Sequence, residues 1–383
     1  MRLSLLLALL PYALGAPILT PRAGQVIPGK FIVKMKDDAL QEALEAAINL
    51  FPHDAEHVFG FGKFKGFSAE LSDAVVELIA ALPGVDYIEK DAIVQHTTYV
   101  TQSSSTWGLG RISHKNAGTS SYTYDDSAGA NTCAYVIDTG IYTAHPEFEG
   151  RATFLANYAG DGQNTDGNGH GTHVAGTIGS KTYGVAKKTK LFAVKVLDAS
   201  GSGTNSGVIA GINYAANDQK TRAGCANGSV GNMSLGGSKS TAVNQAAASS
   251  VSAGLFLAVA AGNDGANAAN YSPASEPTAF TVGATDSSDR IASFSNYGAV
   301  VDIFAPGVSI LSTWNNGGTN TISGTSMATP HVAGLGAYIL GLEGKRTPAA
   351  LGARLVALAT KNKITGLPSG TANNLAFNGN PSG

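Results

Sequence analysis

Residues 133–140 read CAYVIDTG, an apolar run that ends at the carboxylate of Asp138. A short run of β-branched and aromatic residues that stops near a glycine is typical of a buried strand. Similar runs lie at 191–196, 255–260 and 279–282, and helix-like segments separate them. This alternation predicts an α/β fold with a mostly parallel sheet flanked by helices. Ligand sites in such folds lie at the carboxyl ends of the strands. Asp138 is therefore a candidate site residue, although an aspartate there is more often a turn or cap residue.

The start of the chain has the pattern of a secretory signal peptide. A charged beginning precedes an apolar run at 3–10, and small residues follow at 13–16. A transmembrane anchor needs about 20 apolar residues, and flanking prolines keep this run shorter. We therefore expect residues 1–16 to be a signal peptide and the protein to be secreted, extracellular and without a membrane anchor.

Residues 17–99 alternate strand-like and helix-like patterns. The expected order is strand, helix, strand, helix, strand, over 30–35, 38–50, 57–71, 72–82 and 87–95. Such an order suits a small ferredoxin-like α+β domain. The polar stretch at 97–106 has no periodicity, which is typical of a cleavable linker. We expect a larger domain over residues 100–383.

The formal net charge of −2 is spread unevenly. Residues 17–98 carry 7 basic and 12 acidic side chains, whereas residues 99–383 carry 17 basic and 15 acidic ones. Proteins that bind nucleic acid through its phosphates present a basic stripe. Neither segment has one, so nucleic acid is not an expected partner.

The chain has two cysteines, Cys133 and Cys225. In the oxidising compartment that a signal peptide implies, such a pair most simply forms one disulfide. Two buried thiols are the alternative.

The motif at 168–173, NGHGTH, places His170 at the start of a helix rich in small residues. His170 and His173, three residues apart, could also be metal ligands, but no carboxylate or cysteine follows at the expected spacing. His173 fits a core histidine better.

The motif at 323–331, SGTSMATPH, joins a loop to a helix, so Ser326 is expected at a helix N-terminus, where backbone amides favour negative charge. By itself Ser326 could simply cap that helix. Acyl transfer from an amide, however, needs a nucleophile, a base, a group that holds the base and donors for the oxyanion. Ser326, His170 and Asp138 supply the first three.

Over nearly all of residues 105–383 the chain resembles the subtilase family, and within it the proteinase K-like branch. The resemblance rests on the two motifs above and on 107–109 (WGL), 136–140 (VIDTG), 183–186 (YGVA), 233–237 (MSLGG), 260–263 (AAGN) and 271–274 (YSPA). It implies a subtilisin-like three-layer fold and a serine endopeptidase that acts on proteins or peptides without a catalytic cofactor. It also implies that residues 17–99 are a propeptide that assists folding and inhibits the site until it is cut away.

The resemblance assigns roles to further residues. Ser326 is the nucleophile, His170 the general base and Asp138 the residue that orients it, while the Asn263 amide joins the Ser326 N–H in the oxyanion hole. The stretches expected to pair with the substrate backbone are Gly201, Ser202, Gly203 and Ser234, Leu235, Gly236, and the second stretch walls the primary pocket together with Ala260, Ala261 and Gly262.

These walls carry no charge, so hydrophobic or aromatic residues are expected before the cut, with broad specificity. Many members of the branch have an aromatic residue where this chain has Asn205, which leaves finer selectivity open. Met327, next to the nucleophile, is expected to be partly accessible by the same resemblance.

Asp302 matches a carboxylate that holds a structural calcium in this branch, with the carbonyls of Pro277 and Ala279 as partners. Oxygen ligands suit calcium, although a solvated loop aspartate is the simpler interpretation. A second calcium site of relatives is expected to be absent, because Lys363 stands where they have an acidic residue.

Two other classes of function remain open at this point. One is a catalytically inactive relative that binds peptides, and the other is a metal-dependent hydrolase that uses His170 and His173. The protein is expected to be a monomer. Asn227, Asn232 and Asn270 fit the N-x-S glycosylation pattern, but Asn232 adjoins the expected pocket.

Overall fold

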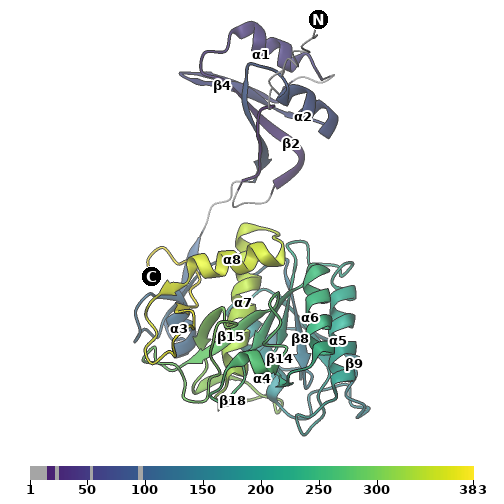
Figure 1. The fold of residues 1–383 in the computed structure, drawn as a ribbon, viewed down its shortest axis with the longest axis vertical. Coiled ribbons are helices and arrows are strands. Elements are labelled where there is room, and N and C mark those ends of the chain that lie inside the picture. Colours follow the sequence, from purple (N-terminus) through teal and green to yellow (C-terminus); the bar gives the residue numbers. More distant parts are fainter. Residues whose placement is uncertain (1–14, 22–25, 52–54, 94–97) are drawn as a thin grey trace, which may run out of the picture. The chain divides into compact units, whose positions relative to one another are not determined.

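The computed structural model describes residues 15–21, 26–51, 55–93 and 98–383. Most of the expected signal peptide, residues 1–14, therefore lies outside the described residues. The chain folds as two compact units that divide between residues 96 and 97 (Figure 1).

The N-terminal unit is a twisted sheet with two helices. Its described residues form a five-stranded sheet in the order β1-β5-β2-β4-β3, in which β2 is antiparallel to both β4 and β5. Val33, Phe67, Ile79 and Ile88 are fully buried in its core. The elements are β1 (Ile18–Leu19), β2 (Val26–Met35), α1 (Gln41–Ile48), β3 (His57–Phe61), β4 (Phe64–Glu70), α2 (Asp73–Ala80) and β5 (Val85–Ala92).

The single strand expected over 57–71 is wrong, because this segment is the hairpin β3–β4. The chain turns at Gly62, whose positive φ of 56° suits a glycine in a tight turn. Aromatic and polar residues alternate without a break through this short turn. The period-two pattern therefore predicts one long strand instead of two short ones.

The C-terminal unit is built on a large sheet whose order among the described residues is β19-β20-β16-β15-β13-β11-β8-β10-β9. All neighbours run parallel except the short pair β19–β20. Its strands are β8 (Cys133–Asp138), β9 (Ala152–Asn157), β10 (Lys190–Lys195), β11 (Ser229–Met233), β13 (Phe256–Ala260), β15 (Phe280–Thr285), β16 (Ile303–Pro306), β19 (Thr360–Lys361) and β20 (Asn374–Leu375). All four predicted strands are confirmed, as β8, β10, β13 and β15.

Helices cover both faces of this sheet because its strands are apolar on both sides. In β8, Cys133, Tyr135 and Ile137 pack with residues of α5 and α6, whereas Ala134 and Val136 pack with residues of α3, α4, α7 and α8 (Figure 1). The predicted three-layer fold is therefore confirmed. The helices are α3 (Trp107–Ser113), α4 (His170–Gly179), α5 (Asn205–Asp218), α6 (Thr241–Ser252), α7 (Thr325–Glu343) and α8 (Pro348–Leu358), with short 3₁₀ turns η1 (Pro146–Phe148) and η2 (Ala268–Asn270).

Three two-stranded ribbons complete this unit. They are β6 (Tyr99–Gln102) with β7 (Tyr122–Asp125), β12 (Gly237–Ser238) with β14 (Tyr271–Ser272), and β17 (Ile310–Thr313) with β18 (Thr319–Ile322). Within the expected linker 97–106, residues 99–102 form the strand β6 although the stretch has no periodicity. A strand forms there because β7 supplies a pairing partner, and Thr101 Oγ1 lies 2.9 Å from Thr123 Oγ1.

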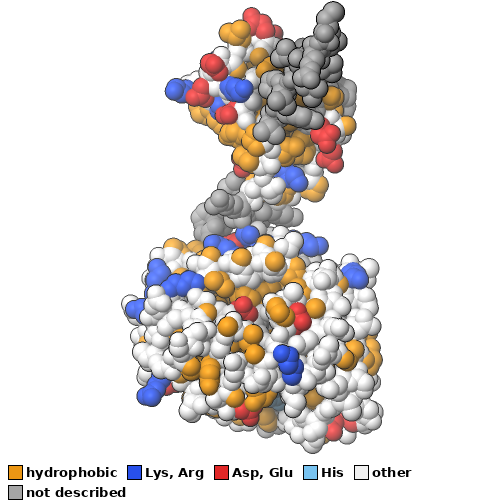
Figure 2. Space-filling view, viewed as in Figure 1, with side chains coloured by type: hydrophobic (Ala, Val, Ile, Leu, Met, Phe, Trp, Pro, Cys, Tyr) orange, Lys and Arg blue, Asp and Glu red, His pale blue; other side chains and the backbone are white. Residues whose placement is uncertain are grey.

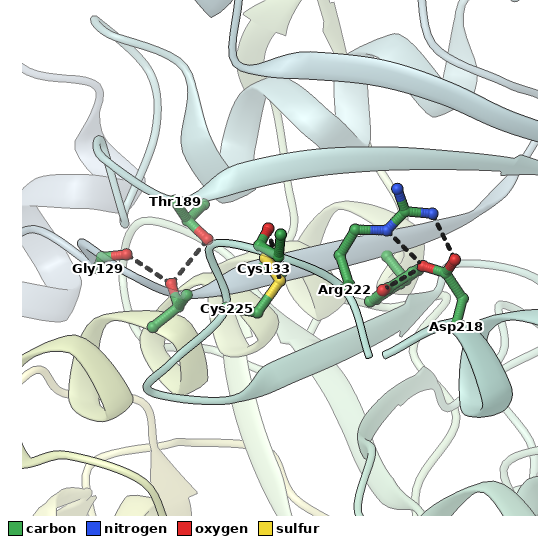
Figure 3. Close-up of a disulfide and its surroundings, with 9 residues drawn as sticks. Gly129, Cys133, Thr189, Asp218, Arg222 and Cys225 are labelled. Atoms are coloured by element: carbon green, nitrogen blue, oxygen red, sulfur yellow. Dashed lines mark hydrogen bonds and ion pairs between the residues drawn. A yellow bond between two sulfur atoms is a disulfide. The ribbon is translucent and has the colours of Figure 1, made fainter. Parts of the chain in front are cut away.

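Cys133 and Cys225 form a disulfide, as predicted (Figure 3). The bond ties the first residue of β8 to the loop after α5, across 92 residues of sequence. Beside it, Asp218 accepts hydrogen bonds from Tyr135 and Arg222. Closing a loop of this length stabilises the folded chain by about 4–5 kcal/mol in the chain-entropy model. Among the described helices, none is both long and apolar enough to cross a membrane.

Candidate active site

Asp138 and His170 meet at the carboxyl edge of the large sheet. Asp138 is the last residue of β8 and its side chain is fully buried, while His170 begins α4 and its side chain is 24% exposed. His170 Nδ1–H donates to Asp138 Oδ1 over 2.7 Å. Gly169 precedes the helix with a positive φ of 109°, and a side chain there would collide with the Trp314 ring. The glycine is thus needed both for its conformation and for the close approach of Trp314.

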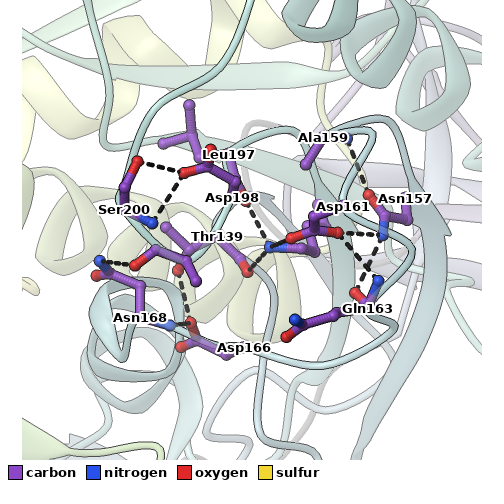
Figure 4. Close-up of polar contacts among 12 residues, drawn as sticks. Thr139, Asn157, Ala159, Asp161, Gln163, Asp166, Asn168, Leu197, Asp198 and Ser200 are labelled. Carbon is purple, nitrogen blue, oxygen red and sulfur yellow. Dashed lines mark hydrogen bonds and ion pairs between the residues drawn. The ribbon is translucent and has the colours of Figure 1, made fainter.

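A second carboxylate, Asp166, holds the His170 loop in place (Figure 4). Its Oδ1 accepts hydrogen bonds from Thr139 Oγ1 (2.8 Å) and from the amides of Asn168 and Gly169 (3.0 and 2.8 Å). Its Oδ2 accepts from the Thr172 amide and hydroxyl. Sequence reasoning missed Asp166, although an acid shortly before a helix is a usual partner for free N-terminal amides.

A buried lysine braces the turn after Asp138 and was also missed. Lys195 is fully buried at the end of β10, and its Nζ lies 3.0 Å from Asp161 Oδ2. The same ammonium donates to the carbonyl oxygens of Thr139 (2.9 Å) and Leu197 (2.6 Å), which links the ends of two neighbouring strands. Partial burial raises the pKa of Asp161, but hydrogen bonds from its neighbours and Lys195 outweigh this and lower it to about 2. Figure 4 shows Asp161 beside this turn.

The charge state of His170 follows from its neighbours. Burial alone lowers the pKa of its imidazole, but the charge and hydrogen bond of Asp138, with a contribution from Asp166, outweigh burial and raise the net pKa above its ordinary value. His173 behaves differently, because burial lowers its pKa to about 4. Its Nε2 is hydrogen-bonded to the carbonyls of Ile310 and Asn320, which confirms the interpretation as a core histidine.

Ser326 is the second residue of α7, as expected for a helix N-terminus. Its Oγ donates to the Ser234 carbonyl oxygen over 3.1 Å. The adjacent Met327 is only 1% exposed and belongs to the core between α7 and the sheet. The prediction that Met327 is partly accessible is therefore wrong. Successive helix residues point about 100° apart, so the neighbour of a cleft-facing serine turns into the interior.

The backbone N–H of Ser326 and the side-chain amide of Asn263 lie close together at the start of α7. Asn263 Oδ1 accepts from the Thr325 amide (2.8 Å) and hydroxyl (2.9 Å), which fixes the orientation of its amide group. A methyl group added to Gly324 would lie 3.6 Å from Ser326 N and 3.7 Å from Asn263 Nδ2. Both nitrogens therefore lie near one point beside Gly324, and N–H groups in such a place can stabilise a negatively charged oxygen.

The cleft along this site consists of two cavities that share Leu235, Gly236 and Gly237. One of about 550 Å³ is lined by His170, Asn205 and the segment 200–204, which includes Gly201, Ser202 and Gly203. The other, of about 300 Å³, is lined by Ser326, Asn263 and the predicted wall Ala260, Ala261 and Gly262. Asp264 also lines the smaller cavity, a carboxylate that sequence reasoning did not include.

Asp302 immediately precedes β16, and its amide donates to the carbonyl of Thr281 in β15. Its Oδ2 accepts from the Thr281 amide over 2.7 Å, and burial raises the pKa of its carboxyl to about 6, although that hydrogen bond lowers it. Lys363 stands where the sequence predicts that a second calcium site is absent, and its Nζ lies 3.5 Å from Asn116 Oδ1.

Two family models match the two units. Residues 129–374 match the subtilase family, and residues 30–97 match peptidase inhibitor I9. The chain belongs to the subtilase family. It is thus a serine endopeptidase with a zymogen-type propeptide, and the expected resemblance to the proteinase K-like branch is confirmed.

Individual relatives agree with this. The chain is 56% identical over 390 residues to a cuticle-degrading protease of Metarhizium anisopliae, covering 99% of this chain and 100% of the relative. It is 61% identical over 294 residues to proteinase T of Parengyodontium album, covering 77% and 99%. Among solved structures, a cold-adapted subtilisin-like serine proteinase is 46% identical, with a TM-score of 0.68 and coverage of 72% and 99%.

Proposed function

We propose that this subtilase is a secreted, self-processing zymogen that hydrolyses proteins with broad specificity through Ser326, His170 and Asp138. The observation that carries the proposal is the 2.7 Å hydrogen bond from His170 Nδ1 to the buried Asp138 carboxylate. It fixes the tautomer of the imidazole, so that Nε2 is left as the proton acceptor.

The catalytic steps can then be assigned to individual residues. His170 takes the proton from Ser326 Oγ as that oxygen attacks the scissile carbonyl carbon, and Asp138 stabilises the resulting imidazolium. The oxyanion accepts hydrogen bonds from Ser326 N and Asn263 Nδ2, which both lie near Gly324. His170 next protonates the leaving amine, and water, activated by the same imidazole, releases the acyl group.

The cleft supports the proposed substrate preference. Gly201, Ser202 and Gly203, with Ser234, Leu235 and Gly236, offer backbone groups to an extended peptide. The smaller cavity, walled by Ala260, Ala261 and Gly262, takes a hydrophobic or aromatic side chain before the cut. Asp264 lies in the same lining and disfavours acidic side chains there, because like charges repel.

Residues 17–99 act as the inhibitory propeptide and residues 100–383 as the enzyme, consistent with the inhibitor I9 match over 30–97. The disulfide suits an oxidising extracellular compartment. We expect a monomer, because the described large apolar side chains of the enzyme unit that are exposed, Tyr158 and Leu311, are only 37% and 36% accessible.

We also propose that Asp302 holds a structural calcium with the carbonyls of Pro277 and Ala279. Burial raises the pKa of its carboxyl to about 6, and a bound divalent ion would keep it ionised. The ion has no part in the catalytic steps above.

Labelling with a phosphonylating serine reagent tests the catalytic assignment. We expect modification at Ser326 alone, loss of activity in proportion to labelling, and no labelling of the Ser326→Ala variant. A matched control is Ser323→Ala, which removes an exposed hydroxyl from the same loop and should be labelled like wild type. Activity that is abolished by chelators at low temperature, without labelling, would support a metal enzyme. A folded protein with neither labelling nor activity would support an inactive peptide-binding relative.

A further inference from the structure

The helix that carries Ser326 lacks one of its own hydrogen bonds. In an α-helix the carbonyl of residue i accepts from the N–H of residue i+4. For Ser326 that position is Pro330, which lies inside α7 and has no N–H. The Ser326 carbonyl therefore needs another donor.

Ser234, which follows β11, supplies this donor. Its Oγ donates to the Ser326 carbonyl oxygen over 2.7 Å, while Ser326 Oγ donates to the Ser234 carbonyl oxygen over 3.1 Å. The two residues thus form a reciprocal pair across 92 residues of sequence. Ser234 is only 3% exposed, so water does not compete freely for these bonds.

Asn232 orients the Ser234 hydroxyl. It lies in β11, is 1% exposed, and its Nδ2 donates to Ser234 Oγ over 2.9 Å. The Ser326 carbonyl can only accept, so the Ser234 hydrogen must point to it and Asn232 must present its N–H side. The Oδ1 atom of Asn232 is buried and has no hydrogen-bond partner among the described residues. A buried amide with one unsatisfied oxygen is costly, which fits a residue retained for positioning.

We propose that Asn232 and Ser234 are positioning residues that replace the helix bond removed by Pro330. They thereby hold the nucleophile against segment 234–236, which is proposed to pair with the substrate backbone. The inference rests on the proposed role of Ser326. The chain of contacts runs from Asn232 through the Ser234 hydroxyl to the first turn of α7, which also carries the oxyanion donor Ser326 N. Loss of these contacts should shift both the Ser326 hydroxyl and the Ser326 N–H. Misplacement of such groups lowers mainly the rate of the chemical step.

A double-mutant cycle between Ser234→Ala and Pro330→Ala tests this. Ser234→Ala in the wild-type background should lower kcat by about 10- to 100-fold, with KM changed less than kcat and the acidic midpoint of the pH profile unchanged. Pro330→Ala restores a backbone N–H at i+4, so in that background Ser234→Ala should cost about threefold or less. An equal loss in both backgrounds would overturn the proposal.

Two further variants keep the test sharp. Asn232→Leu keeps the branched shape of the side chain but removes the donor, and it should lower kcat in wild type but add little to Ser234→Ala. If Ser234→Ala does not fold, the cycle is run with Asn232→Leu and Pro330→Ala instead. Ser250→Ala is the matched control, because Ser250 is a 1% exposed serine in α6 that also donates to a carbonyl. Its kcat should equal that of wild type.

Phosphonylation separates this inference from the catalytic assignment. If Ser326 is not the nucleophile, the wild-type protein itself is not labelled at Ser326. If Ser326 is the nucleophile but the positioning role is wrong, wild type and Ser234→Ala are labelled at equal rates.

Discussion

The two units of the chain bury different kinds of side chain. In the N-terminal unit the described polar side chains that are buried are Lys34 and Ser68, whereas the C-terminal unit buries Asp138, Asp166, Lys195 and many others. Exposed apolar side chains show the reverse. Among the described residues they are Ile18, Leu19, Leu40, Leu50, Val58, Phe61, Leu78 and Ile93 in the N-terminal unit, and Tyr158 and Leu311 in the C-terminal unit.

Figure 2 shows hydrophobic side chains gathered on the visible face of the N-terminal unit. A small domain that leaves such surface exposed is suited to contact another protein surface. A large domain can bury charges, because it has enough partners to satisfy them. The chemistry therefore belongs to the C-terminal unit, and the N-terminal unit is suited to binding.

The largest expected effect follows from removing the nucleophile. Ser326→Ala should lower peptide cleavage by about 10⁶-fold, the order found when subtilisin loses its nucleophile. If the enzyme unit makes the maturation cut itself, as proposed, the variant should also leave the precursor uncut near residues 96–101. Electrophoresis of the purified variant checks this, and added wild-type enzyme should restore the cut. Maturation of the pure variant without added protease would contradict self-processing.

Matched core substitutions test whether the units are independent. Ile79 in α2 and Ile178 in α4 are both fully buried, and each change to alanine should cost about 2–5 kcal/mol in its own unit. Ile79→Ala should weaken hydrogen-exchange protection of the N-terminal unit but leave the melting temperature of the mature enzyme unchanged. Ile178→Ala should lower that melting temperature. A lower melting temperature of the mature enzyme obtained from the Ile79→Ala precursor would show that the stabilities of the two units are not independent.

Calcium should stabilise only the enzyme unit. At a free concentration 100 times its Kd, an ion that binds only the folded state adds about 2.7 kcal/mol, and Asp302→Asn should remove this gain. Glu149→Gln, which removes an equal charge from an exposed residue, should respond like wild type. Protons compete for Asp302, whose pKa is raised to about 6, so the calcium effect should fade below that pH. Equal melting temperatures in calcium and in chelator would remove the site.

The smallest effect is a shift in the pH profile. His170 must be neutral to accept a proton, and its pKa is raised above the ordinary 6.5, so kcat/KM should rise with pH and reach its half-value above 6.5. Measurements on a substrate without ionisable groups check this. The midpoint should be the same for the enzyme matured by itself or by added protease, because the carboxylates that raise it, Asp138 and Asp166, both belong to the C-terminal unit. Activity that peaks near pH 4 would contradict the mechanism.

The sequence alone predicted the layers of the fold and the elements that carry Asp138, His170 and Ser326. These predictions succeed because they depend on local patterns. An apolar run specifies a buried strand, and small residues beside glycine specify where a helix begins. The positions of the three residues at the ends of those elements then follow from the parallel sheet.

Only the tertiary structure decided which side chains meet across the chain. The Lys195 ammonium reaches the Thr139 carbonyl 56 residues away, and Ser234 reaches Ser326 across 92. The family resemblance also misjudged Met327, because its burial depends on what packs against α7. These contacts depend on how the large sheet and its helices pack together. The two partners of each contact are too far apart in the sequence for a local pattern to include both.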